Sequence, residues 1–409
     1  MIPGTTSFSL SLGFVIIALT QPAFALSPSS TISYEQHRLL QEALKADKAS
    51  MTKSTASRSA VGQFASNQSM NPDISFILDV AMAWFSDAKP LQLGAHDPNQ
   101  IGFTFQQLEA HIESRVDPYF DFQANLVFSL FGVELEEAYA QTLALSGGFK
   151  IKVGQFLLPF GRINPTHPHT WAFLDQALII GKFMGGEGGR GLGLEVSWLA
   201  PLPWYLNLIL ATTLPAGECC SRSFIGEHKE PVNGMEDFLY LGRAEQFWEL
   251  NDNWSLLLGL SYLFGENKTG LNNHSALTSA DLLLRYRPLH STDQQSLSVQ
   301  AEWTHRTRQL PERVLKDHGG YVHTILQCNP HWSMGARLEW VDGVQQDPQD
   351  PTWSKPRIRS EAQITWHPSH FSRLRFQIGR DHPTWRNDPI WSAIVGVEVL
   401  VGAHSAHTY

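Results

Sequence analysis

Residues 296–308 read SLSVQAEWTHRTR, and polar and apolar side chains alternate through Trp303. Successive side chains of a β-strand point to opposite faces, so a strand here would have one apolar and one polar face. The apolar face would carry Leu297, Val299, Ala301 and Trp303, and the polar face Ser298, Gln300, Glu302, Thr304, Arg306 and Arg308. The same period of two recurs in residues 331–341, 357–366 and 373–379. The sequence therefore predicts an all-β chain.

Alternation of this kind is typical of both soluble β-sandwiches and membrane β-barrels. In a sandwich the apolar face packs into a core, and strands are usually about 5–6 residues long. The stretches here run for about ten residues and carry charges on the second face, which fits a lipid-facing wall around a polar lumen. We therefore expect an antiparallel transmembrane β-barrel over residues 73–409.

The lengths of the connections support this interpretation. We predict about sixteen strands, with long outer loops alternating with short periplasmic turns. One connection breaks the rhythm, because only a tight turn at Gly132 stands where an outer loop is expected. The predicted long connections include 86–100, 161–189, 214–235, 266–276, 310–318 and 343–356. The longest, 161–189, would be the third outer loop, and by analogy with general porins we predict that it forms a constriction inside the lumen.

The N-terminal region predicts export. Residues 1–25 combine an apolar run over 10–19 with Ala23-Phe24-Ala25, which is a small-x-small cleavage pattern, although no Lys or Arg precedes the run. Residues 26–72 predict a short periplasmic helix over 34–51 followed by a polar linker. They would form either a flexible leader or a plug or trimerising element. No later stretch reaches the roughly eighteen apolar residues of a membrane-spanning helix. Export without such a helix fits the bacterial outer membrane.

One stretch resembles a known family. Residues 153–162, VGQFLLPFGR, are similar to the G-Q-F-x-x-P-F-G signature of the phosphate-selective porin O/P-like family. Residues 164–171, NPTHPHTW, and Gly191-Leu192-Gly193 resemble porin-like proteins often labelled zinc-regulated TonB-dependent outer-membrane receptors. The resemblance implies an outer-membrane barrel that admits small solutes. TonB-dependent receptors have roughly 22 strands and a folded plug, for which residues 26–72 are too short.

Charged residues on the predicted inward faces are the candidate pore lining. Two arrangements remain open: a basic wall that faces an acidic one and orients solutes, or charges that pair with neighbours in a wide pore. The acidic faces also carry Asp79, Glu134 and Glu136. The candidate pore-lining residues are Arg285, Arg287, Arg306, Arg308, Arg337, Arg357, Arg359, Arg373, Arg375, Lys150, Lys152, Glu109, Glu113, Asp121, Asp175 and Glu187.

Histidines are weaker candidates. His167 and His169 flank Pro168 close to Asp175, and imidazole with carboxylate can ligate zinc. Their spacing fits no standard zinc pattern, so we expect no metal site and a proline-rich turn instead. The run 185–191, GGEGGRG, contains a G-x-G-x-x-G match, but a strand rather than a helix is predicted after it, so a hinge is expected in place of a dinucleotide site.

Other function classes find little support. The sequence has no nucleophile elbow and no H-E-x-x-H motif, so we expect neither an enzyme nor a cofactor. The net charge of -9 argues against nucleic-acid binding. We expect passive diffusion of small hydrophilic solutes or ions through a barrel in contact with outer-membrane lipid. The oligomeric state is undecided, with a homotrimer as one candidate. The alternative function is that of a TonB-dependent-type or zinc-linked outer-membrane receptor.

Overall fold

The computed structural model describes residues 72–402 apart from 144, 216–221, 225–231, 233, 268, 271, 289–294 and 348–352. The predicted signal peptide, the predicted helix over 34–51 and the C-terminal Tyr409 lie outside the described residues.

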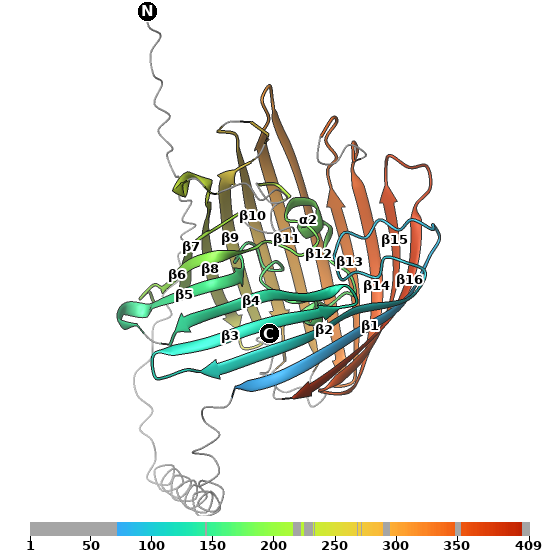
Figure 1. Cartoon of the computed structure of the whole chain (residues 1–409). Coiled ribbons are helices and arrows are strands. Elements are labelled where there is room, and N and C mark those ends of the chain that lie inside the picture. The colour runs from blue at the N-terminus through green and yellow to red at the C-terminus, as the bar shows by residue number, and fades with distance from the viewer. Residues whose placement is uncertain are drawn as a thin grey trace, which may run out of the picture. The chain divides into compact units, whose positions relative to one another are not determined.

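The described residues form one closed barrel of sixteen antiparallel strands (Figure 1). Each strand pairs with its neighbours in sequence, and β1 pairs with β16 to close the ring. The all-β, sixteen-strand prediction is therefore confirmed. The strands are β1 (Asp73–Phe85), β2 (Gly102–Arg115), β3 (Phe120–Ser129), β4 (Gly132–Thr142), β5 (Phe149–Leu157), β6 (Arg190–Leu199), β7 (Tyr205–Thr213), β8 (Leu239–Asn251), β9 (Trp254–Glu266), β10 (His274–Tyr286), β11 (Ser296–Gln309), β12 (Val314–Asn329), β13 (Trp332–Val341), β14 (Arg357–Ser369), β15 (Ser372–Pro383) and β16 (Ile390–Gly402).

Strand β1 shows how the sequence pattern produces the wall. Phe76, Met82 and Trp84 are exposed on the outer face, whereas Asp79 and Ala81 between them are buried on the inner face. Large apolar side chains exposed to the surroundings would be costly in water but suit a lipid contact. The strands therefore use one face for lipid and the other for the lumen.

Aromatic pairs mark the end of the barrel that has the short turns. Trp332 and Trp366, on neighbouring strands, stack with ring centroids 6.2 Å apart. Further pairs at the same ends of β5 to β10 are Phe149–Trp198, Tyr205–Phe247 and Trp254–Tyr286. Aromatic girdles lie at membrane interfaces in outer-membrane barrels, so these rings indicate the level of one interface.

One predicted connection is wrong. Strand β12 begins at Val314, so the expected long connection 310–318 is a turn of four residues, 310–313. Leu315 and Asp317 are buried inside the barrel, and Asp317 pairs with Arg306 on β11. Asp317 therefore lies on the lumen face, whereas Lys316 and His318 are exposed, and β12 pairs with β11 up to Val314.

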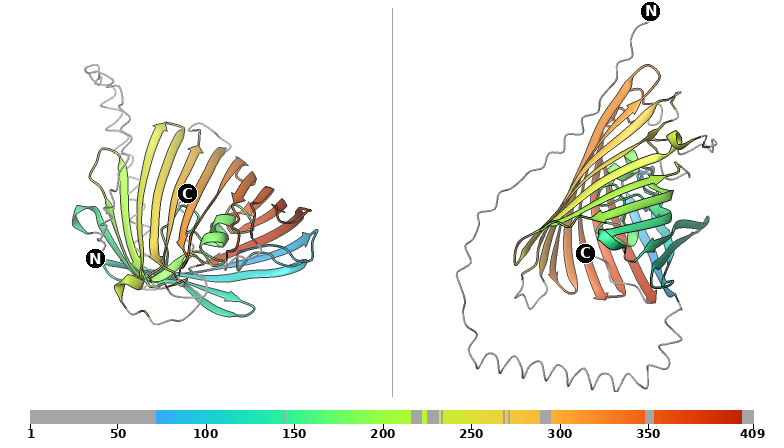
Figure 2. Two further views of the ribbon diagram at one scale, coloured as in Figure 1. Left: turned by 90° about the horizontal axis from the view of Figure 1, so that it is seen from above. Right: turned by 90° about the vertical axis from the view of Figure 1, so that its left-hand side faces the viewer.

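The longest connection, 158–189 between β5 and β6, packs inside the barrel, and we call it the lumen segment. It contains η2 (Pro168–Thr170) and α2 (Leu178–Phe183), and α2 contacts β12 and β13 within the ring of strands (Figure 2). Two other short helices, η1 (Ser146–Gly148) and η3 (Met235–Asp237), belong to connections. None of the helices in the described part of the chain has the length and apolar character that a bilayer-spanning helix requires.

Candidate functional site

The lumen segment leaves β5 through a turn at Gly161. This residue has φ of +62°, in the left-handed region that glycine adopts without strain. A side chain here would also collide with the carboxylate of Glu302. The Gly161 N–H donates to Ser261 Oγ at 3.1 Å, and the Ile163 N–H donates to Glu302 at 3.2 Å. The proline–phenylalanine–glycine end of the family-like signature thus directs the chain across the lumen to β9 and β11.

Asn164 joins the two ends of the lumen segment. Its side-chain amide donates to the carbonyls of Leu158 and Gly189, each at 2.8 Å, and its carbonyl accepts the Gly189 N–H at 2.7 Å. A direct backbone bond from Leu158 N–H to Gly189 carbonyl adds to this clasp. The lumen segment is therefore a loop whose two ends are hydrogen-bonded to each other.

Two histidines fasten the segment to β2 and β4. His169 Nδ1 lies 2.7 Å from Glu109, and His167 contacts Glu136 and Glu137, each at 2.9 Å. Consecutive strand residues normally face opposite sides, but the β3–β4 pairing shifts register at this point, between Asn125 and Leu126. This bulge explains how both glutamates reach the lumen. The two imidazoles stack with centroids 5.7 Å apart.

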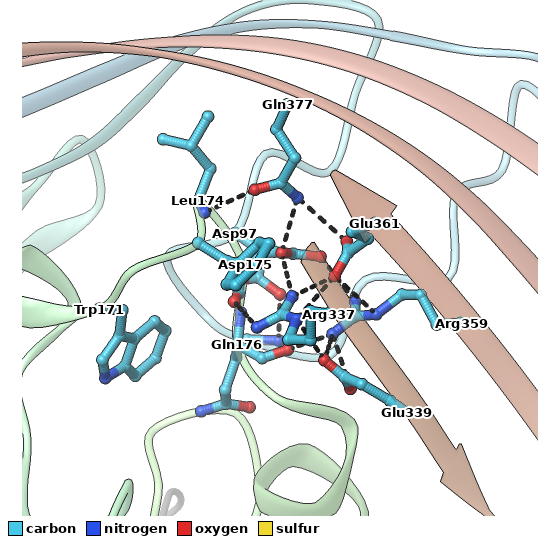
Figure 3. A network of polar contacts seen from close by, with 12 residues as sticks. Asp97, Trp171, Leu174, Asp175, Gln176, Arg337, Glu339, Arg359, Glu361 and Gln377 are labelled. Atoms are coloured by element: carbon cyan, nitrogen blue, oxygen red, sulfur yellow. Dashed lines mark hydrogen bonds and ion pairs between the residues drawn. The ribbon is translucent and has the colours of Figure 1, made fainter. Parts of the chain in front are cut away.

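Asp175 fastens the segment to β13, β14 and β15 (Figure 3). Its carboxylate accepts from Arg337 at 2.5 Å, from Arg359 at 2.6 Å and from Gln377 at 2.9 Å. Burial alone would raise the pKa of Asp175, but Arg359 and Arg337 outweigh it and hold this pKa below its usual range. The network continues on the wall through Glu339 and Glu361, and Trp171 stands apart from it.

Asp97, in the connection between β1 and β2, lies beside this network. It accepts the Gln176 N–H at 2.8 Å. Burial and the nearby Asp175 raise the pKa of Asp97 to about 6. Asp175 is thus the charged partner of the arginines, and Asp97 is the carboxyl that takes up a proton more readily.

The apolar side of the segment packs against β7 to β10, β12 and β13. Leu178, Ile180 and Phe183 are buried together with wall residues such as Leu241 and Leu263. Lys182 is buried among them, 4.0 Å from Asp317, with its ammonium 4.4 Å from the Trp353 ring centroid. Much of the outer part of the lumen is therefore filled by a packed apolar core.

Two small cavities remain between the lumen segment and the wall. The first is lined by residues that include His96, Glu136, His167 and Glu187. The second is lined by residues that include Asp79 and Arg375. The lining residues shared by both cavities are His96, Asp97, Pro168 and Trp171. The two cavities are therefore contiguous along the side of the segment that faces β1 to β4.

No protein-family model matches the chain. An uncharacterized protein of Aquifex aeolicus (strain VF5) is 30% identical over 393 residues, which cover 84% of this chain and 81% of that protein. The chain belongs to the same family as this Aquifex protein.

Solved structures resemble the chain in fold alone, because their identities are low. An anion-selective porin from Comamonas acidovorans has a TM-score of 0.53 at 12% identity, over 81% of this chain and 99% of that chain. The outer-membrane channel DcaP of Acinetobacter baumannii has a TM-score of 0.54 at 9% identity, over 81% and 97%. The trimer form of Vibrio cholerae OmpT has a TM-score of 0.51 at 9% identity, over 81% and 99%. The fold is that of a bacterial outer-membrane porin barrel.

The predicted arginines do not form a free basic wall in this family member. Seven of the nine lie beside acids and six of these seven are buried, which favours the second arrangement, in which lumen charges pair with their neighbours. The acids come from the same or adjacent strands or from connections, and sequence order alone does not reveal these pairs. The pairs are Arg306–Asp317, Arg308–Asp347, Arg337–Glu361, Arg357–Asp381, Arg359–Glu339, Arg373–Glu398 and Arg375–Glu398.

The other candidates are more scattered. Arg287 is exposed beyond the end of β10, so its predicted place on the inward face of that strand is wrong. Arg285 is half-buried on β10, and Lys150 is exposed near the start of β5. The remaining contacts are Lys152 with Glu195 at 3.4 Å, Glu113 with His111 at 3.5 Å, Asp121 with Arg115 at 3.7 Å and Glu187 with His96 at 3.2 Å.

Sequence reasoning missed two of the residues that hold the segment in place, Asn164 and Glu302. Asn164 and Glu302 were recognisable only as a loop residue and an inward strand residue, and nothing in their spacing shows that they bind the same turn. The three described His, Asp or Glu residues placed closely enough to share a metal ion are His96, Glu136 and Glu187, a group that includes neither His167 nor His169.

Lys182 predicts a pH-dependent stability. Burial, and then the nearby Arg306, lower the pKa of Lys182 to about 7. The unfolded chain keeps the ordinary pKa near 10.5, so between these values it binds more protons and folding stability rises with pH. From pH 7 to pH 9 this group should contribute about 2 kcal/mol to the free energy of unfolding.

The measurement compares the wild type with Lys182→Met by urea unfolding in lipid vesicles. The difference between the two proteins isolates Lys182, since other titrating groups cancel. We expect the free energy of unfolding of the wild type to increase relative to that of Lys182→Met as pH rises. A difference that is constant across this window would contradict the assignment.

Proposed function

We propose that the protein is an outer-membrane channel through which small hydrophilic solutes or ions diffuse passively. The observation that carries the proposal is a closed sixteen-strand barrel whose lumen contains its own β5–β6 connection, bound to several sides of the wall. A barrel of this size leaves an aqueous channel unless something fills it. The lumen segment is thus the constriction, and it sets the size of solute that passes.

The proposed path follows the two contiguous cavities between the lumen segment and β1 to β4. Carboxylates predominate along this path, with Asp79, Asp97, Glu136 and Glu187 against one lining arginine, Arg375. Elsewhere in the lumen, Arg306, Arg337 and Arg359 lie beside acids. Rings of acidic side chains favour cations in a narrow pore, so we propose a cation preference. The O/P-like resemblance implies entry of small solutes and does not extend to phosphate selectivity.

The test is single-channel recording of the refolded mature chain in a planar bilayer under a KCl gradient. We expect stepwise openings with a reversal potential whose sign shows K⁺ preference. Asp97→Asn should reduce that potential at a pH well above 6, where Asp97 is ionised. Glu113→Gln removes the same charge from an inner face outside both cavities and should change it less.

Two outcomes would contradict the proposal. A barrel that inserts without conducting would favour the alternative of a receptor that needs energy coupling to open. An anion preference would move the path to the arginine side of the segment. A homotrimer stays a prediction, and the similarity to a barrel described in a trimer form supports it.

A further inference from the structure

A second group of polar side chains lies where the lumen segment returns to β6. His96 comes from the β1–β2 connection, Glu136 from β4 and Glu187 from the end of the lumen segment. One nitrogen or oxygen atom from each of them lies within 4.8 Å of the other two. Three segments distant in sequence thus present one imidazole and two carboxylates to a single point.

The surroundings of this point offer further donors. The side-chain carbonyl of Gln176 is buried, has no hydrogen-bond partner, and belongs to a residue that lines the same cavity. The Gln176 amide nitrogen donates to the Gly186 carbonyl at 2.8 Å, which holds this side chain next to Glu187. His167, another lining residue, contacts Glu136 at 2.9 Å. An unsatisfied buried oxygen is costly, and a ligand in the cavity would satisfy it.

The group is not over-neutralised by neighbouring cations. Arg190 has Nη1 3.9 Å from Glu136, but its Nη2 binds Glu134 instead, and the imidazole of His167 divides its two nitrogens between Glu136 and Glu137. His96 is 13% and Glu187 15% exposed, so an ion can reach them from the outer mouth while Glu136 is buried behind them. The site is thus accessible on one side and preorganised on the other.

We propose that His96, Glu136 and Glu187 bind a divalent transition-metal ion of the Zn²⁺ class, with the Gln176 carbonyl or a solvent molecule as the further ligand. Nitrogen and carboxylate oxygen ligands in this number suit four-coordinate zinc. The imidazole distinguishes the site from magnesium and calcium sites, which use oxygen ligands. A bound ion would join the β1–β2 connection, the β4 wall and the lumen segment, and would lie directly in the proposed path.

This inference goes beyond the proposed function, and its primary test does not require conduction. The refolded full-length mature chain in detergent is titrated with ZnCl₂ by calorimetry, with MgCl₂ as the comparison metal. We expect one equivalent of Zn²⁺ to bind and Mg²⁺ to bind far more weakly. His96→Ala and Glu187→Gln should each weaken Zn²⁺ binding by about tenfold or more, which is what loss of a ligand-supporting partner already costs.

The matched control is His318→Ala, which removes a half-exposed histidine paired with Asp342 at the same rim. Its affinity for Zn²⁺ should equal that of the wild type. Heat-modifiable migration of each variant on a gel verifies that the barrel is folded. Absence of Zn²⁺ binding, or equal affinity in His96→Ala, would overturn the proposal. The proposal would also be overturned if Zn²⁺ binding were lost only in the double variant His167→Ala/His169→Ala, because the metal would then lie at the stacked histidines.

A conductance measurement then separates the two hypotheses. If the metal lies in the path, Zn²⁺ should lower the single-channel current of the wild type and leave that of His96→Ala unchanged. Binding without any effect on the current would keep the metal site and contradict the proposed path alone.

Discussion

A chain in which residues 165–187 are replaced by a short glycine–serine linker will conduct several times the current of the wild type. The design is feasible because Asn164 and Gly189 are hydrogen-bonded to each other, so a short linker can close the gap without moving β5 or β6. The excised residues include α2, His167 and Asp175, which occupy the lumen. A barrel of about sixteen strands without them is wide enough for a continuous water column.

The excision also has a cost that can be foreseen. Wall residues such as Leu241 and Leu277 lose their apolar partners, and Arg337 and Arg359 become exposed to water. The arginines keep Glu339 and Glu361 as partners on the wall, so no charge is left buried alone. We therefore expect a less stable barrel that still closes.

The control for this experiment shortens a different connection at the same rim. Residues 384–388, between β15 and β16, contact Asp87, Trp353 and Pro356, all outside the lumen segment, and only Trp385 among them packs against the apolar core. Replacing them with the same linker should leave the single-channel conductance near the wild-type value. Equal conductance in the excised and wild-type proteins would mean that ions avoid the space that the lumen segment fills.

Replacing Arg359 with glutamine should destabilise the barrel by about 3 kcal/mol, which is typical when one partner of a buried ion pair is removed. The Arg359 guanidinium donates to Asp175 at 2.6 Å, to the Gln176 carbonyl at 2.6 Å and to Glu339 at 3.1 Å. Its loss leaves three acids around Arg337 alone. The expected measurements are a lower urea midpoint in lipid vesicles and noisier open-channel current, since the lumen segment loses its main attachment to β14.

Arg380→Gln is the matched control because it removes an arginine from the neighbouring strand. Arg380 is only partly buried, and its guanidinium lies 6.0 Å from the ring of Trp391. Surface cation–π contacts contribute about 0.5–1 kcal/mol, so we expect a small change. If both variants lose the same amount of free energy of unfolding, the cause is the loss of one positive charge rather than of the network around Asp175.

The barrel was predictable because its signal is repeated and local. Alternation such as that of residues 296–308 is written into each strand, and the lengths of the connections add an independent count. The start of β12 was not predictable, because Lys316, Asp317 and His318 resemble a solvated loop until the partner of Asp317 is known. Local composition cannot distinguish a solvated charge from one that is buried beside an arginine.

The site was predictable in its location and not in its contacts. Residues 161–189 stood out by length, and their glycine and proline content suggested turns. Their partners lie on strands far away in sequence, and one of the attachments depends on a bulge that turns both Glu136 and Glu137 inward. Neither feature leaves a period or a spacing in the sequence that could be recognised in advance.

The path of the lumen segment constrains the order in which this protein can be assembled. Arg375 on β15 donates to the carbonyl of Trp171, a residue 204 positions earlier in the chain. The segment therefore cannot reach its final position until the last strands have arrived. Until then Phe173, Leu178 and Phe183 lack much of their burial, and the half-built wall presents unpaired strand edges. During assembly these apolar side chains must be kept from aggregating. Pairing of β1 with β16 is the step that encloses them in the lumen.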